Sequence, residues 1–236
     1  MENIMKVHVR GNMCVQILET FVALSRVTKH EKPIVFVNTL GLSGDLAVEH
    51  LSKLFDCNFE IRVQEEMRKT PYWETGCARQ VFHNRERILR QWMRPKPFLM
   101  ESRAANAPQR TADTKVALHI RSGDKSSITY EGCLKLAEIA KAEGEVTLFS
   151  DNLKLEIPGT SRVRGSPVED WASIFSSSII YCGPSMFPLT SLLLDPTIPV
   201  RVAGESWCDN NIASNDYVFI REAQEFCPNL QVIDHA

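Results

Sequence analysis

Several signatures of well-known protein classes are missing from this chain of 236 residues. It has no glycine-lysine-threonine phosphate loop, which excludes a nucleotide site of that type. It has no C-x-x-C pair, and its six histidines are scattered without metal-ligand spacing, which argues against a zinc ribbon or a histidine-bound metal. Gly41-Leu42-Ser43-Gly44 comes close to a nucleophile elbow, but Asp45 stands where that motif needs glycine.

The chain also has little net charge and no long apolar run. A formal charge of -2 gives no global attraction to nucleic acid or anionic membrane, so local charges must hold any anionic ligand. No apolar run reaches the roughly 18 residues of a membrane helix, and the N-terminus lacks the apolar core of a secretory signal. The seven cysteines, an odd and scattered set, favour a reducing compartment over a disulfide framework. We therefore expect a cytoplasmic protein with no integral membrane segment and no nucleic-acid partner.

What the chain does contain is an alternation of strand-like and helix-like segments. In its first part we expect strands at 4–9, 33–38 and 57–63 and helices at 13–27, 46–55 and 74–93. The last of these helices is basic, and prolines end it. Strands that alternate with helices predict a parallel sheet with helices on its faces.

A second series of the same kind follows a change in composition. Residues 101–115 are poor in apolar side chains, which predicts a linker. Beyond it we expect strands at 116–120, 145–150, 178–182 and 199–203 and helices at 130–142, 168–176 and 189–194. The sequence therefore predicts an α/β fold with two halves, residues 1–100 and 113–236, and a ligand cleft between them.

Three predicted strands of the second half end in residues that suit a nucleotide. Arg121-Ser122-Gly123-Asp124 offers a guanidinium that can bond two phosphate oxygens and a glycine that lets backbone come close. Asp151-Asn152 offers a carboxylate for a base or for sugar hydroxyls, and Gly183-Pro184-Ser185 offers a hydroxyl before a helix. The carboxyl ends of parallel strands share one edge of a sheet, where open α/β sheets bind ligands. Ordinary turn, cap and ion-pair chemistry would account for the same residues without a ligand.

Five short blocks, in order, make the chain resemble the α-1,2-fucosyltransferase family, within the superfamily of inverting two-domain fucosyltransferases. They are similar to the motifs G-N-Q-M-F-Q, G-Y-W/F-Q with its following helix, H-x-R-x-G-D, F-S-D-D and D-L…G-N-S-S-F-S. In this chain the blocks are Gly11-Asn12-Met13-Cys14-Val15-Gln16, Pro71-Tyr72-Trp73 with Arg94-Pro95-Lys96-Pro97, His119-Ile120-Arg121-Ser122-Gly123-Asp124, Leu148-Phe149-Ser150-Asp151-Asn152, and Glu169-Asp170 through Gly183-Pro184-Ser185-Met186-Phe187.

The resemblance implies a compact glycosyltransferase of the GT-B type, in which two Rossmann-like halves face a cleft. Its N-terminal half would lie on the acceptor side and its C-terminal half would bind the nucleotide sugar. Arg121 would hold the donor's diphosphate, His119 would touch the nucleotide or orient its strand end, and Asn12 would lie near the departing sugar. The same match assigns substrate binding to Gly11, Gln16, Gly123, Asp151, Asn152, Glu169, Ser185 and Phe187.

These observations lead us to expect an inverting, metal-independent glycosyltransferase that moves a 6-deoxyhexose, first of all fucose from GDP-fucose, to a hydroxyl of a glycan acceptor. Ser150-Asp151-Asn152 lacks the spaced aspartate pair of metal-using transferases, and Arg121 can neutralise the leaving group instead, so no metal or cofactor is expected. Asp124 is the third catalytic candidate, and Asp124, Glu169 and Asp45 stay open as the base. The alternatives are another donor, such as a rhamnosyl nucleotide sugar, and a catalytically silent nucleotide- or glycan-binding module.

Overall fold

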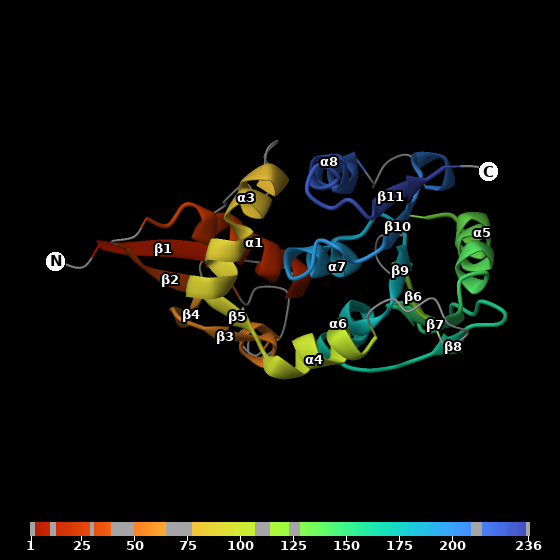
Figure 1. Cartoon of the computed structure of the whole chain (residues 1–236), viewed down its shortest axis with the longest axis horizontal. Coiled ribbons are helices and arrows are strands. Elements are labelled where there is room, and N and C mark those ends of the chain that lie inside the picture. The colour runs from red at the N-terminus through yellow and green to blue at the C-terminus, as the bar shows by residue number, and fades with distance from the viewer. Residues whose placement is uncertain are drawn as a thin grey trace. The chain divides into compact units, whose positions relative to one another are not determined.

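Two compact units, Met1–Pro97 and Phe98–Ala236, make up the chain. The computed structural model describes residues 3–9, 13–28, 31–38, 50–64, 77–106, 114–122, 128–208 and 214–234. Each unit is built on a parallel sheet with helices beside it (Figure 1). The chain is therefore an α/β protein, as the alternating segments predicted.

The first unit contains a three-stranded parallel sheet in the order β1-β2-β4. Its described elements are β1 (Asn3–Val9), α1 (Met13–Ser25), β2 (Glu31–Asn38), β3 (Phe55–Cys57), β4 (Glu60–Gln64), α3 (Cys77–Gln91) and β5 (Met93–Pro95). β3 and β5 pair antiparallel, so they form a separate small ribbon. Helix α1 packs on α3 and buries Ile17, Leu18, Phe21 and Leu24 completely, at the spacing of one helical face.

The second unit contains six parallel strands, whose order across the sheet is β8-β7-β6-β9-β10-β11. Their bounds are β6 (Lys115–Ile120), β7 (Glu145–Ser150), β8 (Ser161–Arg162), β9 (Ile179–Cys182), β10 (Val200–Ala203) and β11 (Leu230–Ile233). In order of chain position this is 3-2-1-4-5-6, the doubly wound arrangement of dinucleotide-binding folds. The direction of winding reverses between β6 and β9, which makes that pair the topological switch point of the sheet.

Helices cover both faces of this sheet. They are α4 (Pro97–Ala105), α5 (Tyr130–Lys141), α6 (Pro167–Ser176), α7 (Met186–Leu189), α8 (Ser214–Ala223) and the short 3-10 helices η1 (Thr190–Leu193) and η2 (Glu205–Trp207). Helix α5 lies on one face, and α6 and α7 lie on the other (Figure 1). Trp171 of α6 is fully buried, stacks on Phe175, and donates its indole N–H to Thr190 Oγ1 at 3.0 Å. This tryptophan is therefore part of the core.

Helix α4 corrects the expected linker, because residues 101–105 are helical. Arg103 is only 6% exposed and donates Nε to Asp195 Oδ2 at 3.1 Å and Nη1 to the Ser177 carbonyl at 2.6 Å. Burial opposes ionisation of Asp195, but bonds from Thr197 and Arg103 outweigh it and hold the pKa of this carboxyl below its ordinary value. A paired arginine therefore anchors α4 to the rest of the second unit. The low apolar content of residues 101–105 predicted a linker because this polar contact cannot be seen in the sequence.

Candidate functional site

The carboxyl ends of β7, β6 and β9 lie next to one another at one edge of the second sheet. Strand β6 pairs with β7 on one side and with β9 on the other, which confirms the predicted alignment of these three strand ends. At the end of β9, the Gly183 N–H donates to the His119 carbonyl of β6 at 3.3 Å. Open α/β sheets bind ligands outside the carboxyl ends of their strands at the switch point, so this edge is the candidate site.

His119 is the buried centre of this edge, with 7% of its surface exposed. Its ring stacks on Phe187, with centroids 5.2 Å apart and planes 15° from parallel. Burial lowers the pKa of His119 to about 4; the Asp151 carboxylate raises it and the Arg121 charge lowers it further. The imidazole is therefore neutral near pH 7. Its Nδ1 is buried and has no hydrogen-bond partner among the described residues, which leaves a polar atom for a ligand to satisfy.

Asp151 and Asn152 reach from the end of β7 to the loop after β6. The Ser122 N–H donates to Asp151 Oδ1 at 2.7 Å, and Asn152 Nδ2 donates to Ser122 Oγ at 3.1 Å. Asp151 itself is exposed, whereas Arg121, Ser122 and Asn152 are half-buried. The structure thus brings Arg121, Asp151 and Asn152 together with His119, as the strand ends predicted.

Ser185 and Phe187 lie directly after β9, on the β9 side of this edge. Ser185 is 2% exposed, and its Oγ accepts a hydrogen bond from the Phe187 N–H at 3.4 Å, which caps the short helix α7. The cap fixes the start of α7, from which Phe187 reaches the ring of His119. The role of the Ser185 hydroxyl that the structure shows is therefore to cap this helix.

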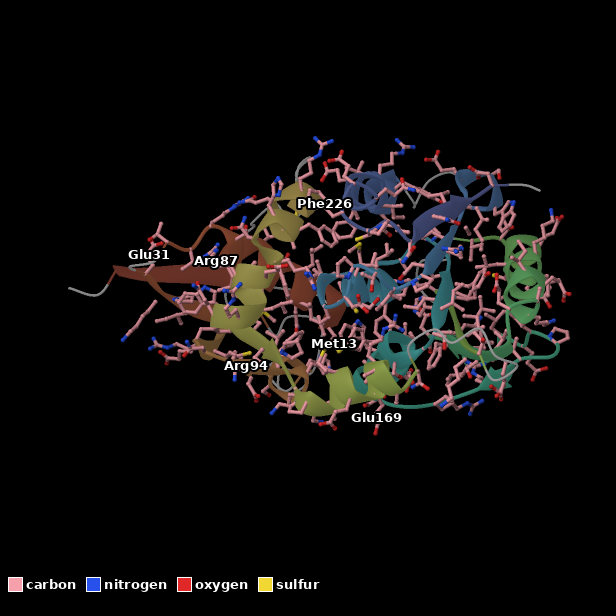
Figure 2. The ribbon with its side chains drawn as sticks, viewed as in Figure 1. Met13, Glu31, Arg87, Arg94, Glu169 and Phe226 are labelled. Atoms are coloured by element: carbon pink, nitrogen blue, oxygen red, sulfur yellow. The ribbon has the colours of Figure 1, made fainter. Side chains whose placement is uncertain are left out.

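Glu169 stands in a capping box at the start of α6. Its Oε2 accepts from the Ser166 N–H at 2.7 Å, and Ser166 Oγ accepts from the Glu169 N–H at 3.3 Å. The side chain is exposed and lies at the rim of its unit (Figure 2). These bonds give Glu169 a structural role, and its expected contact with substrate stays a prediction.

The structure does not place the remaining predicted site residues at this edge. Gln16 belongs to the first unit, where it is fully buried in α1 and its carbonyl accepts from Thr20 Oγ1 at 2.7 Å. The others fall outside the described residues: Gly11, Asn12, Asp45, Pro71-Tyr72-Trp73, Gly123 and Asp124. Their assignment to the site therefore stays a prediction.

The sequence predicted no role for two residues at this edge: Arg162, and Ser122, which was named only as part of the turn after Arg121. Arg162 lies at the end of β8, and its guanidinium donates to backbone carbonyls of the loop after β7. Ser122 occupies a variable position of the H-x-R-x-G-D block, and Arg162 belongs to none of the five blocks. Both would have required knowing that β8 pairs with β7 and that β7 pairs with β6.

Neither a metal centre nor a membrane span is found in the part of the chain that the structure describes. Within those residues, histidine, cysteine and carboxylate side chains form no group of three that could hold a metal ion. None of the described helices combines the length and apolar character needed to cross a membrane.

Comparison with known proteins gives a likeness of architecture alone. No protein-family model and no curated protein matches the chain. Among solved structures, the chain is similar to the glycosyl transferase family 9 protein from Veillonella parvula, with a TM-score of 0.46 and 10% sequence identity over 85% of this chain and 81% of that chain.

Proposed function

We propose that the chain is a glycosyltransferase that binds a nucleotide-sugar donor at the carboxyl edge of its second sheet. The observation that carries the proposal is His119, a neutral, buried imidazole that stacks on Phe187 at the switch point, beside Arg121. A guanidinium suits a diphosphate, and the buried Nδ1 suits a polar group of the base or ribose. The resemblance of residues 119–124 to the H-x-R-x-G-D motif supports a nucleotide that carries a sugar, because the motif belongs to a family of sugar transferases.

The reaction we propose is a direct displacement at the anomeric carbon. As the bond between the sugar and the diphosphate breaks, negative charge grows on the leaving phosphate and Arg121 neutralises it. His119 is uncharged, so it adds no positive charge beside Arg121. An acceptor hydroxyl attacks from the opposite face, which inverts the configuration, and its proton passes to a carboxylate. Asp124, Asp45 and Glu169 stay the candidates for that base.

The finer assignment is a 6-deoxyhexose from GDP-fucose, transferred to a glycan hydroxyl without a metal ion. It is supported by the order of the motif blocks in the sequence. The metal-free mechanism is supported by Arg121, which can perform the charge neutralisation that a cation performs in other transferases.

Nucleotide binding tests the site and sugar transfer tests the reaction. We would measure thermal stabilisation by GDP, UDP and their sugars, for which a ligand at 100 times its Kd adds about 2.7 kcal/mol of stability. We expect one nucleotide to stabilise the wild type and to lose this effect in Arg121→Ala. Arg201→Ala is the matched control. Arg201 lies in the same sheet, but its guanidinium bonds the carbonyl of Asn229 at 2.9 Å, and Asn229 directly precedes β11, at the amino end of that strand.

Three results would contradict the proposal at different levels. Unchanged affinity in Arg121→Ala would remove the site assignment. Binding of the nucleotide sugar without release of the nucleotide, over a panel of glycan acceptors, would make the chain a binding module. Loss of the transfer rate on addition of EDTA would refute the metal-free mechanism, whereas we expect the rate to stay the same.

A further inference from the structure

We propose that Ser122 donates its hydroxyl hydrogen to the diphosphate of the donor, and that Arg162 is the positioning residue that holds Ser122 in place. The proposal rests on the nucleotide site proposed above. It adds a ligand contact and a supporting side chain that the motif resemblance does not assign. The contacts that carry it run from β8, through the loop after β7, to the loop after β6.

Arg162 organises the loop after β7 by bonding its backbone carbonyls. Nη1 donates to the carbonyls of Leu155 at 2.8 Å and Leu153 at 3.1 Å. Nη2 donates to those of Asn152 at 2.8 Å and Ser150 at 3.4 Å. The backbone of Arg162 pairs with β7, so the sheet holds the Cα of this residue in place. Its guanidinium, at the other end of the side chain, holds the loop. A guanidinium that bonds three carbonyls of one loop, and the last carbonyl of the strand before it, fixes the path of that loop.

The loop held by Arg162 in turn holds Ser122. The Lys154 N–H donates to Asn152 Oδ1 at 3.0 Å, which requires the amide oxygen on that side and turns Nδ2 toward Ser122. Nδ2 donates to Ser122 Oγ at 3.1 Å, and the Ser122 N–H donates to Asp151 Oδ1 at 2.7 Å. Two bonds from adjacent residues of one loop therefore fix both the backbone and the side chain of Ser122.

This arrangement decides which way the Ser122 hydroxyl can act. An amide nitrogen only donates, so Ser122 Oγ is the acceptor in its bond with Asn152, and the hydroxyl hydrogen must point elsewhere. Among the described residues none accepts that hydrogen. Ser122 follows Arg121 in the chain, so a hydroxyl donor and a guanidinium both come directly after the end of β6. A diphosphate, with several charged oxygens, is the ligand class that uses both.

The test compares variants along this chain of contacts. We would measure dissociation constants for GDP, UDP and inorganic pyrophosphate, and amide hydrogen exchange without ligand, in Ser122→Ala, Arg162→Ala and Arg162→Lys. Ser122→Ala is expected to weaken nucleotide binding about 10-fold or more, the range for a hydrogen bond to a charged group, and to leave exchange in residues 150–155 unchanged. Arg162→Ala is expected to weaken binding and to speed exchange at both 150–155 and Ser122.

Two comparisons test whether Arg162 acts by positioning the loop. One asks whether its charge alone is enough, and the other asks whether the loss of any arginine has the same effect. Lysine keeps the charge but has no fork, so Arg162→Lys is expected to resemble Arg162→Ala; full affinity in this variant would show that charge alone matters. The matched control is Arg87→Ala in the first unit (Figure 2). Arg87 likewise donates to three carbonyls, those of Leu24, Ser25 and Val27, at 3.0 to 3.1 Å. Its loss is expected to leave nucleotide affinity unchanged.

The outcomes distinguish this inference from the proposed function. If the wild type binds GDP or UDP, Arg121→Ala does not, and both Ser122→Ala and Arg162→Ala bind like the wild type, the inference is overturned and the site stands. If the wild type binds no nucleotide or pyrophosphate, the proposed function and the Ser122 contact fall together. In that case unchanged exchange in Arg162→Ala would overturn the positioning role as well.

Discussion

Acidification from pH 7 to pH 4 should destabilise the second unit through His119. In the folded chain burial lowers the pKa of His119 to about 4, whereas the ordinary value is 6.5. Between these two pH values the unfolded chain binds a proton at this histidine and the folded chain does not. The contribution of His119 to stability is therefore full above pH 6.5 and is lost as the pH falls toward 4.

The size of the loss follows from the same two values. The difference between 6.5 and about 4, at about 1.4 kcal/mol for each pH unit, gives about 3 kcal/mol. The side chain is 7% exposed, so solvent screening reduces this figure little. Below pH 4 the folded chain also takes up the proton, and the contribution stops changing.

Urea denaturation at pH values from 7.5 to 4, followed by the fluorescence of the four tryptophans, of which Trp171 and Trp207 report on the second unit, measures this slope. We expect His119→Phe, which keeps an aromatic ring against Phe187, to remove about 3 kcal/mol of the pH dependence. His119→Leu should remove the same slope even if it is less stable at pH 7, because the slope depends only on the titrating group. His83→Phe in the first unit is the control. An unchanged slope in both His119 variants would refute the assignment of a neutral, buried His119.

Three further predictions concern the support of the site. Arg103→Ala leaves Asp195 without its cationic partner and is expected to cost about 3 kcal/mol in urea denaturation, whereas a loss below about 1 kcal/mol would contradict the anchoring of α4. Ser166→Ala removes the cap of α6 and is expected to cost about 1 kcal/mol while GDP affinity stays the same. In Gly144→Ala the new Cβ would lie 2.1 Å from the Thr114 carbonyl oxygen, so we expect a loss of about 1 to 3 kcal/mol; wild-type stability would refute this close approach.

Local chemistry made much of the second unit predictable from the sequence. Strand β7 occupies the expected residues 145–150, because its apolar run is bounded by a polar turn on each side. Helix α6 begins one residue before the expected start at 168, where Ser166 and Glu169 form the capping box. In both cases the information that sets the boundary lies within a few residues of it.

Elements held by distant partners could not be predicted in the same way. Helix α4 is anchored by one buried arginine, and strand β11 has a single buried residue, Leu230, so neither shows a clear apolar pattern. At the candidate site, the place of Arg121 and His119 at the carboxyl edge of the sheet could be predicted because they lie at the end of a conspicuous strand. The contacts of Arg162 and Ser122 could not, because they depend on the pairing of β8 with β7 and of β7 with β6.

The strand order of the second unit also determines when during folding the site can come into existence. Strands β6, β7 and β8 follow one another in the chain. On its other side β6 pairs with β9, where Val116 lies opposite Ile179, 63 residues later in the chain. Until the chain has crossed back over the sheet, β6 is an edge strand and the segment that carries Phe187 is missing. Contacts between distant parts of a chain form late. A growing polypeptide that ends before β9 therefore carries Arg121 but lacks part of the proposed nucleotide site, and we expect a nucleotide to stabilise only the completed sheet.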